Sequence, residues 1–137
     1  MTTPSPTDLP ILLTDADVLH RVRTLVGPAC TDRQLWVMFV DGDGRQAPVL
    51  MPIAELPRFP DPERVANLTR ILGGLHHELV TDLGPGSVIL TLERLGPDHM
   101  LPQDRDWAQA LTDACTAGAV ELRGLLLSTP GGVRRLL

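Results

Sequence analysis

Residues 87–92 read Ser-Val-Ile-Leu-Thr-Leu, a short apolar run in which Thr91 is the only polar residue after Ser87. A strand with one face in water alternates apolar and polar residues, whereas a strand buried on both faces is apolar throughout. The run therefore predicts the central strand of a sheet that is covered by helices on both faces.

Downstream of this run, residues 104–117 carry apolar side chains on one side at helical spacing, and Gly118 ends the predicted helix. Residues 120–127 form a second apolar strand. A Pro-Gly-Gly turn at 130–132 then leads into a last short strand, residues 133–136, which we expect at an edge of the sheet.

Upstream, residues 35–40 and 48–53 are two strand-like runs that flank Asp-Gly-Asp-Gly at 41–44, which predicts a β-hairpin. The acidic turn also matches the start of a calcium loop, but the later ligands of such a loop are missing. Before the hairpin, a short helix is expected after a cap at Thr14 or Asp15.

Between the hairpin and the central run, Asp61 and Pro62 are typical of a helix start. The pair Gly73-Gly74 interrupts this helix and indicates close backbone packing or a bend. We expect Leu72 and Leu75 to be buried in the core. The apolar stripe of the helix, at alternating spacings of three and four, comprises Val65, Leu68, Leu72, Leu75 and Leu79.

The order helix, hairpin, helix, strand, helix, hairpin predicts a single three-layer α/β domain with a mixed central sheet of about five strands. A length of 137 residues, 43% hydrophobic and 21% charged, suits one globular domain. We expect residues 1–10 to be a disordered tail and residues 11–137 to form the domain.

Composition also excludes several classes of protein. The net charge is −5, the twelve arginines are scattered and aromatic residues make up 3%, which argues against a nucleic-acid partner. The chain has no lysine, which removes phosphate-loop and Schiff-base chemistry. Two distant cysteines, Cys30 and Cys115, and the lack of any membrane-length apolar run lead us to expect a cytoplasmic protein without membrane partners.

Common catalytic and cofactor motifs are absent, and we expect no catalytic residue, metal or cofactor. His76 and His77 are adjacent on a predicted helix, so their side chains diverge by about 100° and do not easily share a metal. Asp104 and Asp106 open the third helix, where carboxylates are favoured by the helix dipole alone.

The second half of the chain resembles the RadC branch of the JAB (MPN) metallopeptidase-like domains. That family has a strand ending in H-x-H-P, then S-G-x-P-x-P-S-x-x-D opening a helix, then a strand and a hairpin. Here residues 88–94 (Val-Ile-Leu-Thr-Leu-Glu-Arg) match the strand, and residues 102–106 (Pro-Gln-Asp-Arg-Asp) take the place of P-S-x-x-D. The resemblance extends over residues 35–136 and implies the JAB/MPN-like fold.

The zinc-ligand histidines of that family are missing, because residues 93–97 read Glu-Arg-Leu-Gly-Pro where the family has H-x-H-P. Asp106 alone falls on a ligand position, and Gln103 replaces the family's serine. One carboxylate cannot hold a catalytic zinc, which needs three protein ligands. The resemblance thus implies a degenerate domain with a remnant site, whose candidate residues are Glu93, Arg94, His99 and Asp106.

We therefore expect a non-catalytic protein-interaction module that binds a protein partner or associates with itself. The apolar ending Leu136-Leu137 and the edge strand before it motivate this expectation. One alternative is a small-molecule-binding regulatory domain with its cleft above Glu93 and Arg94. The other is a metal-dependent hydrolase whose ligands would come from His76, His77, Asp98, His99, Asp104 and Asp106.

Overall fold

The computed structural model of the protein describes residues 10–136 except 79 and 83, without the side chains of 48, 49 and 75–78. The predicted tail therefore lies almost wholly outside the described residues, and so do the side chains of Leu75, His76 and His77. The helices are α1 (Asp15–Leu25), α2 (Pro62–Glu78) and α3 (Pro102–Ala117). The strands are β1 (Gln34–Val40), β2 (Gln46–Ile53), β3 (Ser87–Glu93), β4 (Glu121–Thr129) and β5 (Gly132–Arg135).

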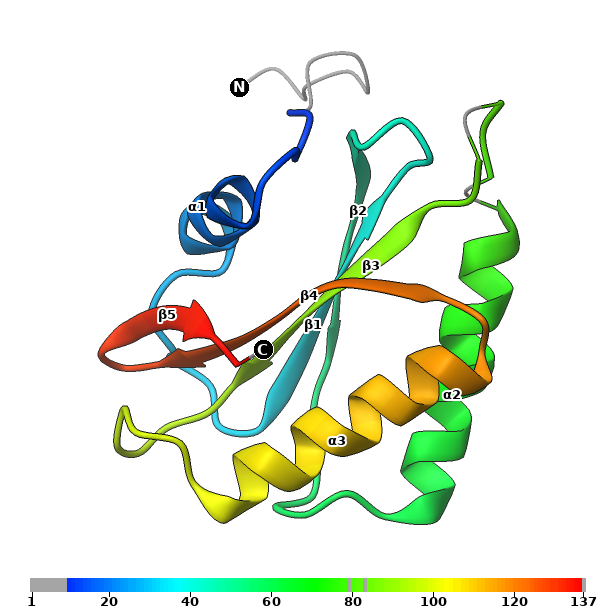
Figure 1. Cartoon of the computed structure of the whole chain (residues 1–137). Helices are drawn as coiled ribbons and strands as arrows, with labels where there is room; N and C mark the ends of the chain where they lie inside the picture. Colours follow the sequence, from blue (N-terminus) through cyan, green and yellow to red (C-terminus); the bar gives the residue numbers. More distant parts are fainter. Residues whose placement is uncertain (1–9, 79, 83, 137) are drawn as a thin grey trace.

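The five strands form one mixed sheet in the order β2-β1-β3-β4-β5, which confirms the α/β class (Figure 1). β3 lies in the middle, and all seven of its residues are buried. It pairs antiparallel with β1, with Val37 opposite Leu90, and parallel with β4, with Leu90 opposite Leu125. The apolar run 87–92 is therefore the central strand, as predicted.

Helices cover both faces of the sheet, so the predicted three layers are present (Figure 1). On one face α1 contributes Val18 and Val22 to a small core with Met38 and Ile89. On the other face α2 and α3 pack over a larger core, in which Leu72 and Leu111 are fully buried. The predicted burial of Leu72 is confirmed.

Local sequence signals account for the helix ends. Thr14 caps α1 in a reciprocal capping box with Asp17, which satisfies backbone N–H groups of the first turn. Asp61 accepts a hydrogen bond from the N–H of Arg64 at the start of α2. α3 begins at Pro102, two residues before the expected Asp104, because proline suits the first helical position, which needs no hydrogen-bonded N–H.

The glycine pair in α2 does not interrupt the helix, which runs from Pro62 to Glu78. Close packing occurs where Gly73 lies against Gly118, at the end of α3. A Cβ atom added at Gly118 would be 3.2 Å from the carbonyl oxygen of Thr69, whereas one added at Gly74 would meet no atom of the described residues within 4 Å. The expected close approach is therefore found at Gly73 and not at Gly74.

The chain end folds back onto the domain. Leu136 is 8% exposed, lies in the core beneath α3 and donates its N–H to the carbonyl of Leu125 (2.8 Å). The expectation that Leu136 projects from the domain is therefore wrong, because its side chain packs in the core; Leu137 lies outside the described residues. β5 is nevertheless an edge strand, as predicted.

Candidate functional site

The last residue of β3, Glu93, lies on the α1 face of the sheet and holds the loop between α1 and β1. Its Oε2 accepts hydrogen bonds from the N–H groups of Cys30 (2.8 Å) and Thr31 (3.0 Å). Its Oε1 accepts from the indole N–H of Trp36 (2.9 Å) and the side-chain amide of Gln34 (3.2 Å). These four bonds fill the acceptor positions of the carboxylate.

Burial alone would raise the pKa of Glu93, but the hydrogen bonds from Cys30, Trp36 and Thr31 outweigh it and hold the pKa below the ordinary glutamate value. The side chain therefore stays ionised at neutral pH. A general acid needs the opposite shift, so this environment is that of a structural anion.

The next residue, Arg94, sends its side chain to the opposite face, which places it under the loop between β3 and α3. Its Nε and Nη2 donate to the two carboxylate oxygens of Asp104 at 2.8 and 2.7 Å. The remaining N–H groups donate to the carbonyls of Leu95, Pro97 and His99 at 3.2, 2.8 and 3.0 Å. All five donors of the guanidinium are thus directed at acceptors of the protein itself.

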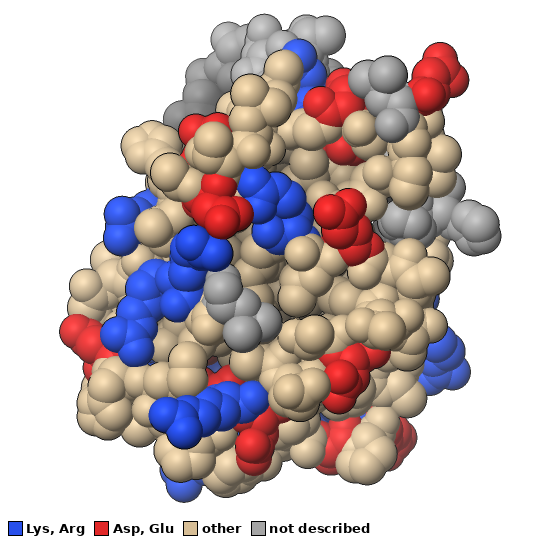
Figure 2. Space-filling view, in the orientation of Figure 1, with Lys and Arg blue, Asp and Glu red and all other residues tan. Residues whose placement is uncertain are grey.

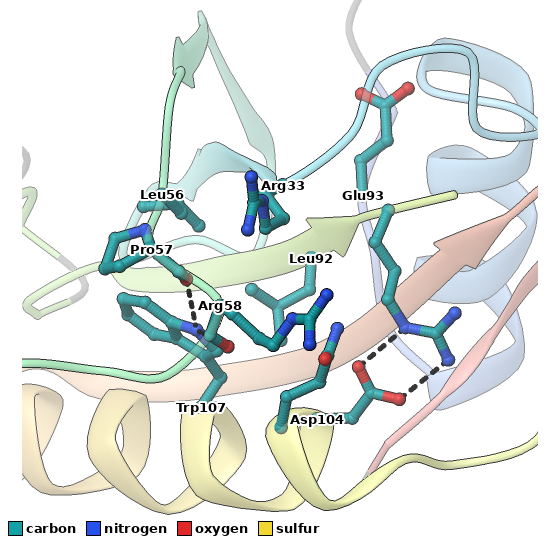
Figure 3. Close-up of a pocket in the computed structure, with 10 residues that line it drawn as sticks. Arg33, Leu56, Pro57, Arg58, Leu92, Glu93, Asp104 and Trp107 are labelled. Atoms are coloured by element: carbon teal, nitrogen blue, oxygen red, sulfur yellow. Dashed lines mark hydrogen bonds and ion pairs between the residues drawn. The ribbon is translucent and has the colours of Figure 1, made fainter. Parts of the chain in front are cut away.

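Asp104 has a second structural task at the start of α3. Its carboxylate also accepts from the N–H of Leu101 (2.8 Å) and so caps the helix. The side chains of Arg94 and Asp104 are 4% and 3% exposed. Figure 3 shows Glu93 and Asp104 on opposite sides of β3, with the two dashed bonds to Asp104 from the arginine.

The other candidates from the sequence do not converge on this ion pair. His99 contributes its backbone carbonyl, and its side chain belongs to an exposed residue. Asp106 is exposed on α3, whereas Asp104 is buried. Asp98 accepts from the hydroxyl of Thr129 (2.9 Å). Among the residues and side chains that the structure describes, no three His, Cys, Asp or Glu side chains are grouped as a metal site.

The positions of the two aspartates along α3 already show in the sequence that they face different sides of the helix. Asp104 precedes Ala108 by four residues and Leu111 by seven, so it lies on the buried face of α3. Asp106 is rotated by roughly 200° from that position and faces away from the core. That signal identifies Asp104 as the buried carboxylate, although it does not reveal Arg94 as its partner.

A hollow of about 250 Å³, including its open side, lies beside this cluster, between the start of α3 and the loop that follows β2 (Figure 3). The indole N–H of Trp107 is not available to a ligand there, because it donates to the carbonyls of Pro57 (3.2 Å) and Arg58 (3.1 Å). The enclosed space itself is about 20 Å³, room for roughly one water molecule, so the hollow does not hold a drug-sized ligand. Its other lining residues include Arg33, Leu56, Leu92 and Gln103.

A larger depression, which we call the β5 groove, lies between α3 and the end of β5. It has a volume of about 620 Å³ including its open side. Its lining residues are Met100, Arg105, Ala108, Gln109, Thr112 and Leu136. Four of them recur along α3 at spacings of three, one and three, so they form one stripe of that helix.

Comparison of the chain with models of protein families, with curated proteins and with solved structures finds no match. The resemblance to RadC-like JAB/MPN domains therefore stays a prediction. In the part of the chain that the structure describes, no helix is long and apolar enough to cross a membrane.

Proposed function

We propose that this chain is a non-catalytic protein-interaction module, built on a JAB/MPN-like fold, which uses its β5 edge to bind a protein partner or a second copy in the cytoplasm. The observation that carries the proposal is the open side of β5, next to the β5 groove. Neither a nucleic acid nor a membrane is part of the proposal.

The backbone of β5 supports this role. Leu136 donates its N–H to Leu125 of β4, and successive residues of an antiparallel strand alternate in direction, so the backbone groups of Val133 and Arg135 point away from the sheet. Arg23 donates to the carbonyl of Val133 (3.3 Å) and covers that one group. The outward groups of Arg135 are thus placed to pair with an added strand.

The state of the buried charges supports a non-catalytic role. Glu93 and Arg94 lie at the strand end where the resembled family carries its zinc ligands, and both are saturated by internal hydrogen bonds. A group whose donors or acceptors are all used by the fold cannot bind a substrate without breaking that fold. The element order, with a hairpin and a helix before the strand–helix–strand unit, is consistent with the resemblance.

Site-specific photo-crosslinking in living cells tests the proposal and is convenient here because the chain has no lysine for amine-reactive reagents. A photoreactive amino acid replaces Arg135 on β5 in one variant and Arg70 on the exposed side of α2 in a matched control. We expect a discrete adduct with one protein, or with a second copy, from the β5 probe alone.

Identical adducts from both probes, or no adduct from the β5 probe, would overturn the proposal. Peptide mapping of the adduct then identifies the segment of the partner, or of the second copy, that lies against β5. Light scattering of the purified chain then separates the two forms of the proposal, since a second copy gives a dimer mass and a separate partner leaves a monomer.

A further inference from the structure

We propose that the partner presents an extended, acidic segment, which adds to β5 as a sixth strand and lays every second side chain in the β5 groove. This inference rests on the proposed function and specifies the chemistry of the partner. It follows from the shape of the groove, the charge at its rim and the charge along β5.

The groove suits alternate side chains of a strand. Successive residues of an added strand point to opposite faces of the sheet, so every second one faces α3. The floor there is formed by Leu136, Met100 and Ala108, which are apolar and wholly or partly buried. Short apolar side chains of a partner would therefore contact this floor, as in known cases of strand addition beside a helix.

The rim of the groove is basic in a chain whose net charge is −5. Arg105 lines the groove, and Arg134 extends from β5 on the same face as Leu136, because alternate residues of a strand share a face. Both arginines are exposed, and neither forms an ion pair with a carboxylate of the described residues. Figure 2 shows basic side chains gathered over β5.

The nearby carboxylates are already engaged. Asp15 pairs with Arg123 (2.8 Å) and Arg135 (3.1 Å) on the α1 face and so offsets part of the positive charge on that side of β5. Asp98 shares a hollow with Arg134 but accepts from Thr129, and it forms no ion pair with the side chains that the structure describes. The groove face thus carries two arginines that no carboxylate of the described residues pairs with, and carboxylates of a partner strand complement them there.

The same charges disfavour a second copy as the occupant. Antiparallel pairing of β5 with β5 would bring Arg134 and Arg135 close to the same arginines of the other copy, and like charges opposite each other destabilise a sheet. A nucleic acid is also a poorer fit, because the groove has an apolar floor and none of the described residues that line it is aromatic, as base stacking requires. An acidic peptide that also carries apolar side chains complements both the apolar floor and the basic rim of the groove.

Selection from a display library of random peptides about eight residues long, enough to span a strand, tests the inference on the full chain. We expect enriched peptides to carry apolar residues and Asp or Glu together at every second position, the positions whose side chains face α3. Fluorescence anisotropy with an enriched peptide should show at least about tenfold weaker binding by the double variant Arg105→Glu, Arg134→Glu. The matched control Arg64→Glu, Arg70→Glu, on the exposed side of α2, should bind within about twofold of the wild type.

Backbone methylation of the peptide tests strand addition separately. N-methyl groups at the positions whose N–H faces β5 should abolish binding, whereas those at the alternate positions should be tolerated. Thermal unfolding of each protein variant confirms that binding is lost without loss of the fold.

Three results would overturn the inference. Enrichment of neutral or basic peptides, or an effect of the charge reversal below about twofold, would refute an acidic partner and leave the β5 crosslink, and so the proposed function, intact. Failure to enrich any peptide would refute strand addition. Binding of a single-stranded oligonucleotide that is lost in the double variant would refute both the inference and the proposed function.

Discussion

Replacing Asp104 by alanine should remove a large part of the stability of the domain. The change leaves the Nε and one Nη2 N–H of Arg94 without an acceptor in a site where that side chain is 4% exposed. It also removes the acceptor for the N–H of Leu101. We therefore expect a loss of about 3–5 kcal/mol in the free energy of unfolding, the cost of breaking a buried ion pair on one side.

The assay is urea unfolding followed by tryptophan fluorescence, with Trp107 three residues from the substitution on α3. For a slope of about 2 kcal/mol per molar urea, the midpoint should fall by about 2 M. A domain of this kind has a free energy of unfolding of about 5–15 kcal/mol in total. The variant should therefore be folded in water with only a small free energy of unfolding, and should unfold in dilute urea.

Asp106→Ala is the matched control, because it removes the same side chain from the same helix at an exposed position. We expect it to change the free energy of unfolding by less than about 0.5 kcal/mol. Replacing both partners, with Arg94→Met and Asp104→Leu, should cost less than the two single changes added together. A loss below about 1 kcal/mol for Asp104→Ala would refute the view that this pair secures the loop between β3 and α3.

Four further predictions concern other parts of the molecule. Because the pKa of Glu93 is lowered in the folded state, ionised Glu93 stabilises the domain at pH values above its unfolded pKa of about 4.3. This contribution is lost as the pH falls through the lower pKa of the folded state. In that acid range, the free energy of unfolding plotted against pH should therefore be flatter for Glu93→Gln than for the wild type. Burial raises the pKa of Cys115 to about 11, so at pH near 8 a thiol reagent should label Cys30 alone until the chain is unfolded. Leu72→Ala should cost about 2–5 kcal/mol in a denaturant titration, whereas Ile71→Ala, at a side chain 41% exposed, should cost far less. Elemental analysis of untagged protein should find no stoichiometric zinc, and close to one zinc per chain would favour the hydrolase alternative.

The fold was predicted well because the burial of β3 on both faces of the sheet leaves a simple pattern in the sequence, a continuous apolar run. β3 is apolar at nearly every position, and the glycine turns and helix caps around it have direct local causes, such as Thr14 and Pro62. The bounds of elements were less accurate: β2 begins at Gln46 rather than at Pro48, because strand pairing with β1 continues to the hairpin turn.

The candidate site was less predictable because its contacts depend on three-dimensional arrangement. Glu93 and Arg94 were identified from the sequence, but their partners come from the loop before β1 and from the start of α3. The β5 groove needs the sheet order as well, since Arg105 and Leu136 meet there only because β5 lies beside β4. Such contacts between distant segments leave no local periodic signal.

The opposite directions of Glu93 and Arg94 also select against mispaired forms of the sheet. The apolar residues of β3 would fit either face, so hydrophobicity alone does not prevent the strand from slipping by one residue. A slip in one direction would aim the carboxylate at Asp104 and at loop carbonyls, and a slip in the other would aim the guanidinium at the N–H groups of Cys30 and Thr31. Both misalignments bring like charges or like dipoles together in a buried site, which raises their free energy. The adjacent charges of Glu93 and Arg94 therefore favour the native alignment of β3 during folding.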